Sequence, residues 1–162
     1  MLRRLAPLTL ALGVTVGCDT AVSPCGAAPP DATANGVAVL GTGSGPTFIP
    51  LDGQRAELVL GAQGGLMITP TLRIPGAARS SGQASCAWIS LQAQVGGGAL
   101  VSAEPTAMEL RRADDDLESE LQWLLGFEVA ELEGHEVSLV AHAIGEPFAV
   151  EARARVTLLR PP

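Results

Sequence analysis

The two histidines of the chain are its first candidates for catalysis or metal binding. His135 and His142 lie seven positions apart, and Glu136 stands beside the first. A zinc hydrolase of the common helical type needs two histidines four positions apart on one helix face, with a glutamate as general base. Here both fall on a predicted strand, where a separation of seven places them on opposite faces. No serine or cysteine nucleophile stands in a matching motif, so we expect neither enzymatic activity nor a cofactor.

Four carboxylates gather at a predicted hairpin tip: Asp114, Asp115, Asp116 and Glu118. Calcium prefers hard oxygen ligands of this kind, and many extracellular modules bind it weakly. The spacing lacks the glycine and the terminal glutamate of an EF-hand loop. A solvated acidic turn is the alternative, so the four residues are weak calcium candidates and the sequence indicates no firm metal site.

Trp88 is the aromatic residue best placed to stack on a ligand. It alternates with an apolar row and shares its predicted strand face with Ser90, Gln92 and Gln94. An exposed tryptophan among amides can stack on a sugar ring or on a protein partner. The alternative is a buried Trp88 packed beside Cys86, as in immunoglobulin domains.

Cys25 and Cys86 remain as an even pair once the earlier Cys18 is set aside. In an oxidising compartment such a pair is expected to form a disulfide. The alternative is two unpaired thiols, with Cys86 packed as a small apolar residue. A zinc site is disfavoured, because two thiols and two distant histidines do not make a tetrahedral ligand set.

Residues 1–17 are typical of a secretory signal peptide. They carry Arg3 and Arg4, then an apolar run at 5–16 that is shorter than the roughly 20 residues of a spanning helix. Gly17 before Cys18 resembles the lipobox of bacterial lipoproteins, in which the cysteine becomes the acylated first residue. The resemblance implies that Cys18 carries lipid such as palmitate. An ordinary cleaved secretory signal is the alternative.

Charge excludes nucleic acid as a partner. The chain has net charge -7, contains no lysine, and would reach about -9 after loss of Arg3 and Arg4. A nucleic-acid binder needs a basic patch that displaces counterions from phosphates. The same negative charge gives no attraction to anionic lipid heads, so membrane attachment must come from the lipid anchor.

Alternation of apolar and polar residues predicts an all-β fold. Period-two rows occur at 37–40, 56–60, 66–74, 87–95, 106–110, 121–129, 137–143 and 148–158. Pro70 within one row indicates an edge strand or a bulge, because proline cannot donate to a ladder. A helix over 117–125 competes locally, since its leucines also fit a helical face. Trp123 is expected in the core.

These rows predict an antiparallel β-sandwich of about seven to nine short strands, with an immunoglobulin-like order as the preferred topology. The sandwich occupies residues 36–162. Residues 18–35 are rich in Ala, Pro, Ser and Thr and form a lipidated, disordered spacer between membrane and domain.

Three motifs carry a family resemblance: LGTG at 40–43, FIPLDG at 48–53 and LGAQGG at 60–65. They are similar to a segment of uncharacterised lipoproteins of myxobacteria and related high-GC bacteria. The resemblance implies class and location only, because no activity is attached to that group.

The expected function is a lipid-anchored module of the bacterial cell envelope, facing the periplasm or the cell surface. We expect a non-enzymatic structural or interaction role with an envelope protein as partner. The alternative is a carbohydrate- or calcium-dependent binding module.

Overall fold

The computed structural model describes residues 25–26, 33–80, 85–98, 100–146 and 148–161 of the chain. The predicted signal peptide, Cys18 and most of the predicted spacer lie outside the described residues. Within the described part, no helix has the length and apolar character needed to cross a membrane.

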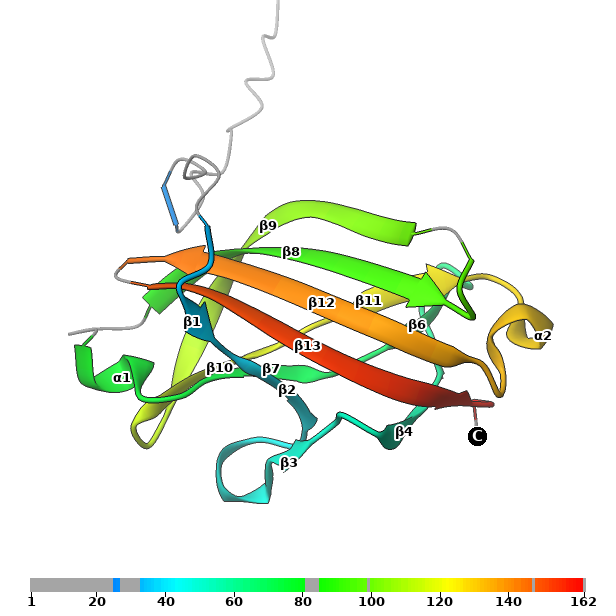
Figure 1. Cartoon of the computed structure of the whole chain (residues 1–162), viewed down its shortest axis with the longest axis horizontal. Coiled ribbons are helices and arrows are strands. Elements are labelled where there is room, and N and C mark those ends of the chain that lie inside the picture. The colour runs from blue at the N-terminus through cyan, green and yellow to red at the C-terminus, as the bar shows by residue number, and fades with distance from the viewer. Residues whose placement is uncertain (1–24, 27–32, 81–84, 99, 147, 162) are drawn as a thin grey trace, which may run out of the picture.

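Strands dominate the described chain (Figure 1). They are β1 (Gly36–Val37), β2 (Val39–Thr42), β3 (Ile49–Pro50), β4 (Gln54–Glu57), β5 (Val59–Leu60), β6 (Leu66–Ile68), β7 (Thr71–Ile74), β8 (Ser85–Val95), β9 (Leu100–Ala113), β10 (Asp116–Glu120), β11 (Trp123–Gly126), β12 (Glu136–Gly145) and β13 (Phe148–Leu159). The helical segments are the 3-10 turn η1 (Gly45–Thr47) and the short helices α1 (Ala77–Ser80) and α2 (Val129–Leu132).

The alternating rows confirm the all-β prediction. In β13 every second side chain from Val150 to Leu158 is buried, while Arg153 and Arg155 point outward. The rows of β8 and β12 alternate in the same way, and Trp123 is buried as predicted. The inward-facing residues form one apolar core, mostly of leucine, valine and alanine, and its removal from water stabilises the fold.

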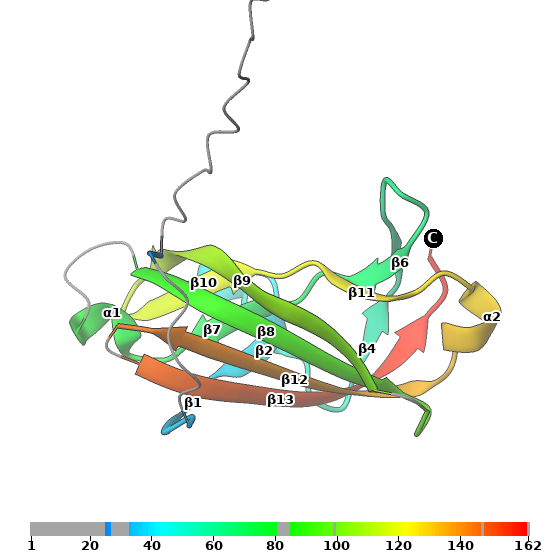
Figure 2. The ribbon, with the colours of Figure 1, turned by 90° about the horizontal axis from the view of Figure 1, so that it is seen from above.

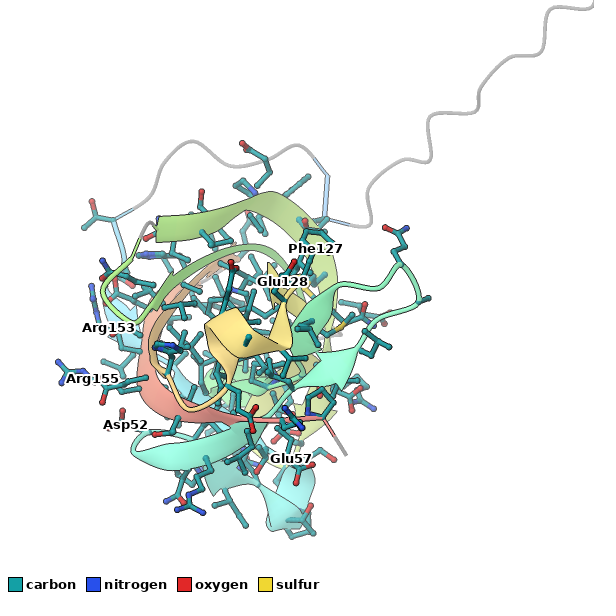
Figure 3. All side chains as sticks on the ribbon, turned by 90° about the vertical axis from the view of Figure 1, so that its right-hand side faces the viewer. Asp52, Glu57, Phe127, Glu128, Arg153 and Arg155 are labelled. Carbon is teal, nitrogen blue, oxygen red and sulfur yellow. A yellow bond between two sulfur atoms is a disulfide. The ribbon has the colours of Figure 1, made fainter. Side chains whose placement is uncertain are left out.

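Two sheets enclose this core, and three chain segments pass from one to the other by changing strand partner: 54–60, 66–74 and 116–126. Residues 36–42 also change partner, from β13 through β1 to β7 through β2, but both partners belong to the ten-stranded sheet. Residues 54–60 pair with β13 through β4 and with β6 through β5. The strands therefore curl into a nearly continuous wall, and α2 lies across one end of it with Leu132 in the core (Figure 3).

Pro70 marks one of these partner changes. The predicted strand at 66–74 breaks there into β6, in the three-stranded sheet, and β7, in the ten-stranded sheet. Proline has no N–H for a ladder, but its carbonyl accepts a hydrogen bond of 2.8 Å from the N–H of Leu121. The break satisfies the backbone while it divides the strand.

The preference for strand over helix at 117–125 is confirmed, because β10 and β11 occupy most of those residues and pair with β7 and β6. Other expectations need correction. The strand predicted to run to Val129 ends at Gly126, and α2 follows. The described chain holds thirteen strands rather than seven to nine, because partner changes divide the predicted rows.

Sheet order also differs from the simplest antiparallel sandwich. Most pairs are antiparallel, but β1 and β4 each pair with β13 in parallel. The strand order gives no confirmation of an immunoglobulin-like topology. The arrangement is a β-sandwich whose sheets curl toward each other.

The predicted disulfide joins Cys25 to Cys86, with 5.2 Å between the two Cα atoms. Cys86 alternates with the buried Ala87 and shares the outer face of β8 with Trp88. The bridge therefore ties the residues before β1 to the outside of the sheet, whereas an immunoglobulin disulfide crosses the core.

We predict that reduction of this bridge lowers the free energy of unfolding by about 4 kcal/mol, because it releases a loop closed across a sequence separation of 61. Urea unfolding with and without reductant measures the loss. The Cys25→Ser/Cys86→Ser variant serves as control and should match the reduced protein. Equal stability of the oxidised and reduced forms would contradict the bridge as a constraint on the unfolded chain.

Candidate functional site

The acidic candidates at 114–118 lie where the sequence placed them, at the hairpin between β9 and β10. Their carboxylates contact protein groups, and Asp116 and Glu118 share Arg73 as an ion-pair partner. Asp115 pairs with Arg79 at the surface, while Asp116 accepts a hydrogen bond of 2.9 Å from the N–H of Gly76. Glu118 points to Arg73 instead. Among the described residues, no three acidic, histidine or cysteine side chains are grouped as metal ligands, so the geometry gives calcium no support here.

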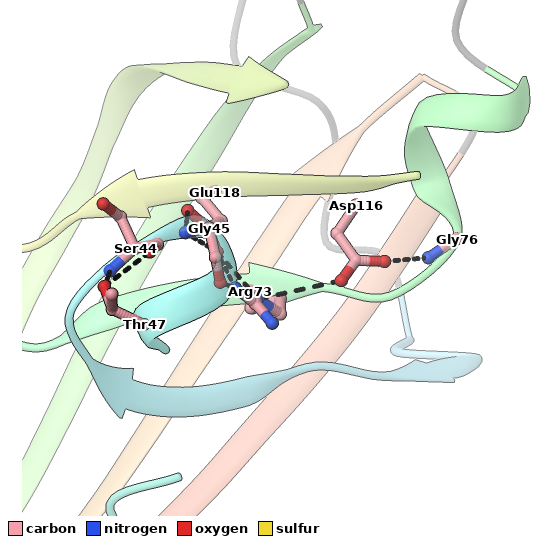
Figure 4. A network of polar contacts seen from close by, with 7 residues as sticks. All are labelled: Ser44, Gly45, Thr47, Arg73, Gly76, Asp116 and Glu118. Carbon is pink, nitrogen blue, oxygen red and sulfur yellow. Dashed lines mark hydrogen bonds and ion pairs between the residues drawn. The ribbon is translucent and has the colours of Figure 1, made fainter. Parts of the chain in front are cut away.

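Glu118 is the most buried of the four, with 3% of its side chain exposed. It accepts a hydrogen bond of 2.7 Å from Nε of Arg73 and two bonds of 3.0 and 3.2 Å from the N–H of Gly45. Nη2 of Arg73 also donates to the carbonyl of Gly45, and its guanidinium lies 4.0 Å from the centre of the Phe48 ring. Figure 4 shows how these contacts fasten the 44–47 turn to β7 and β10.

Gly45 suits this role because its φ is +53°, a conformation that side chains disfavour. Its N–H and carbonyl both reach the buried ion pair. The acidic cluster is therefore part of a structural network, and its partners come from segments distant in sequence.

Trp88 lies on the outer face of β8 with Cys86 and is half-buried. Its Nε1 is buried and has no hydrogen-bond partner within the described structure. A hollow of about 570 Å³ is lined by Thr33, Ala34, Gly36, Val37, Ala38, His142, Glu151 and Arg153. Trp88 is not among the residues that line this hollow.

The polar side of that hollow is an ion cluster on β12 and β13. Nε of Arg153 donates to Glu151 at 2.5 Å, and Nε2 of His142 lies 3.6 Å from the other carboxylate oxygen. The hydrogen bond from Arg153 lowers the pKa of the Glu151 carboxyl below its ordinary value. His135 is exposed near the start of β12 and does not meet His142. The described contacts of these histidines form no catalytic dyad.

An apolar patch on the three-stranded sheet is the most distinctive surface feature. Val59, Met67 and Leu124 stand opposite one another on β5, β6 and β11 and form a row on the outer face. Phe127 extends the row just after β11, and 68% of it is exposed. Together these four residues are called the apolar patch below.

Met67, Leu124 and Phe127 of the patch line a hollow of about 360 Å³ whose lining contains no charged residue. Of the seven large apolar side chains that are exposed in the described residues, Val59, Leu124 and Phe127 belong to the patch. Concentrated exposure of this kind marks an interaction surface, whereas isolated apolar residues do not. This surface is the candidate functional site.

Glycines bring the turn between β5 and β6 against the patch. A Cβ on Gly65 would lie 2.5 Å from Cδ1 of Leu124 and 3.5 Å from Cε1 of Phe127. The absence of a side chain on Gly65 therefore lets the turn pack closely on Leu124 and Phe127. The turn projects from the rest of the domain beside β6 (Figure 2).

Sequence reasoning missed this site. It placed Phe127 in a buried row, because alternation continues past the true end of β11. The only signal was the glycine-rich motif at 61–65, which predicts a turn but not what packs against it.

The comparisons with known proteins find no matching family model, no similar curated protein and no similar solved structure. The site must therefore be interpreted from its geometry.

We predict that Glu118→Ala lowers the free energy of unfolding by about 3 kcal/mol, because it leaves the Arg73 guanidinium without its partner in a largely buried site. Glu120→Ala is the matched control, since Glu120 pairs with Arg111 at the surface and both side chains are mostly exposed. Its loss should cost less than about 1 kcal/mol. Urea unfolding of both variants makes the comparison, and equal losses would refute a special role for Glu118.

Proposed function

We propose that this chain is a lipid-anchored, extracytoplasmic module that binds a protein partner of the bacterial cell envelope through the apolar patch. The proposal is carried by the cross-strand row of Val59, Met67 and Leu124. Phe127 extends this row, and the hollow beside it is lined by no charged residue. Leaving such a row in water is unfavourable, and a partner that covers it recovers the free energy of burial.

The disulfide supports a location outside the cytoplasm. Bridges such as Cys25–Cys86 persist in oxidising compartments and are rare where thiols are kept reduced. Lipidation of Cys18 would hold the domain at a membrane surface, in agreement with the leader expected at residues 1–17.

A protein partner fits the patch better than the alternatives do. A sugar is held by polar groups that hydrogen-bond its hydroxyls, but the cross-strand row of the patch is entirely apolar. Trp88 is half-buried and does not line the hollow that contains His142 and Glu151. An anionic membrane would be repelled by the net charge of -7. An apolar surface of a partner protein needs no polar groups in the row and carries no anionic charge that the domain would repel.

The anchor is tested by growth of cells expressing the full chain with an alkyne analogue of palmitate. We expect label on the wild type and on Cys25→Ser, and none on Cys18→Ser, because acylation depends on the lipobox cysteine. Label that persists in Cys18→Ser, or fails to appear in the wild type, would refute the anchor.

The patch is tested by placing a photo-crosslinking amino acid at position 127 in the native envelope. We expect one discrete protein adduct, which disappears when Leu124 is replaced by Ser. The control position is Val37, which is 79% exposed but belongs to the other sheet. Lipid adducts alone, or identical adducts from positions 37 and 127, would contradict binding of a protein at the patch.

A further inference from the structure

The described wall of strands opens between β9 and β11. β9 and β10 pair only from Arg111 to Ala113, and the two chains then separate. β9 continues along β8, whereas the chain after β10 becomes β11 and pairs with β6 (Figure 2). Within the described residues, no strand pairs with the remaining edge of β9 or with the edge of β11 that faces away from β6.

A hollow of about 290 Å³ lies at this opening. Ile89 and Leu91 of β8 contribute core-facing side chains to it, and Ala103 and Met108 stand on the same side of β9. Ile89 and Leu91 belong to the hydrophobic core, so the hollow reaches the core through the wall. An occupant that completed the wall would present apolar side chains inward.

The rim of the hollow is acidic. Glu104 and Glu120 line it together with the polar Thr106 and Gln122. Both glutamates are exposed, and Glu120 already pairs with Arg111 at 3.3 Å. The carboxylate of Glu104 therefore calls for a basic side chain on the outward face of an occupant.

We propose that this opening accepts an extended segment of a partner protein as an added β-strand, with apolar residues facing inward and basic residues facing outward. Two strand edges that are unpaired among the described residues supply backbone hydrogen bonds, the core-facing floor supplies apolar contact, and Glu104 favours a basic side chain on the occupant. Alternating apolar and basic residues satisfy all three features, because successive side chains of a strand point to opposite faces.

Two features of β9 restrict which segments can pair with its free edge as an added strand. Pro105 removes one N–H from the strand, and the register between β8 and β9 shifts between Ile89 and Leu91. Such features protect an edge against indiscriminate pairing with other copies.

The opening adjoins the candidate site. Gln122 lines both this hollow and the hollow of the apolar patch. The inference rests on the proposed interaction function, since it names the kind of segment that the partner offers. Its test nevertheless uses different residues from those of the patch.

The test is a titration of the isotope-labelled domain, disulfide intact, with a capped peptide of alternating lysine and valine about seven residues long. We expect amide chemical shifts to change at 101–108 and 120–126, and the affinity to fall as salt is raised. A glutamate–valine peptide should bind at least about tenfold more weakly. The lysine–valine peptide with N-methyl groups on alternate residues should bind more weakly, because those residues all face one strand edge and the peptide can then form a ladder with only one of the two strands.

Variants assign the binding to the opening. Glu104→Gln should weaken the lysine–valine peptide by about threefold, the effect of one exposed ion pair. Glu109→Gln on the same strand is the control and should leave the affinity unchanged, since Glu109 does not line the hollow. Absence of binding, equal binding of the methylated peptide, or shifts confined to β5 would overturn the inference.

Discussion

Every strand in a soluble sheet must satisfy its backbone on both edges or leave an edge to water, and this constraint organises the molecule. The chain meets it by changing partner within continuous segments. Residues 36–42 pair with β13 and then with β7 inside the ten-stranded sheet, whereas residues 54–60 pair with β13 and then with β6 and so link the ten-stranded and three-stranded sheets. A core poor in aromatic side chains is enclosed in this way by backbone pairing on nearly all sides.

The Arg73–Glu118 pair satisfies backbone groups at a loop in the same way, because it hydrogen-bonds both the N–H and the carbonyl of Gly45. Burial of a carboxylate is costly unless cations and donors surround it, and here one guanidinium and one backbone N–H supply both. The sequence predicted an acidic hairpin tip at the correct place. It could not predict the partners, because Arg73 lies 45 residues from Glu118 and Gly45 lies 73 residues away. Local pattern predicts where a side chain lies, whereas tertiary contacts decide what it does.

The strands were predictable for a similar reason. One buried face imposes period-two alternation, which identified β8, β12 and β13 nearly residue by residue and placed Trp123 in the core. Alternation carries no information about which strand is the neighbour, so partner changes and the parallel pairs with β13 were missed. It also continues beyond a strand end by chance, which is why Phe127 was assigned to the core and the apolar patch went unseen.

Function is proposed where closure of the wall is incomplete. Where β9 and β11 diverge, core-facing residues of β8 line a hollow, and the outer face of the same three-stranded sheet carries Leu124 and Phe127 in solvent. A chain selected only for stability would fill such an opening, since added apolar contact stabilises a core. The proline and the register shift on β9 guard the free edge against indiscriminate pairing while leaving it accessible. Among the described residues, the edge of β9 is protected against indiscriminate pairing but is not covered by another strand, as expected for a surface that binds a specific partner.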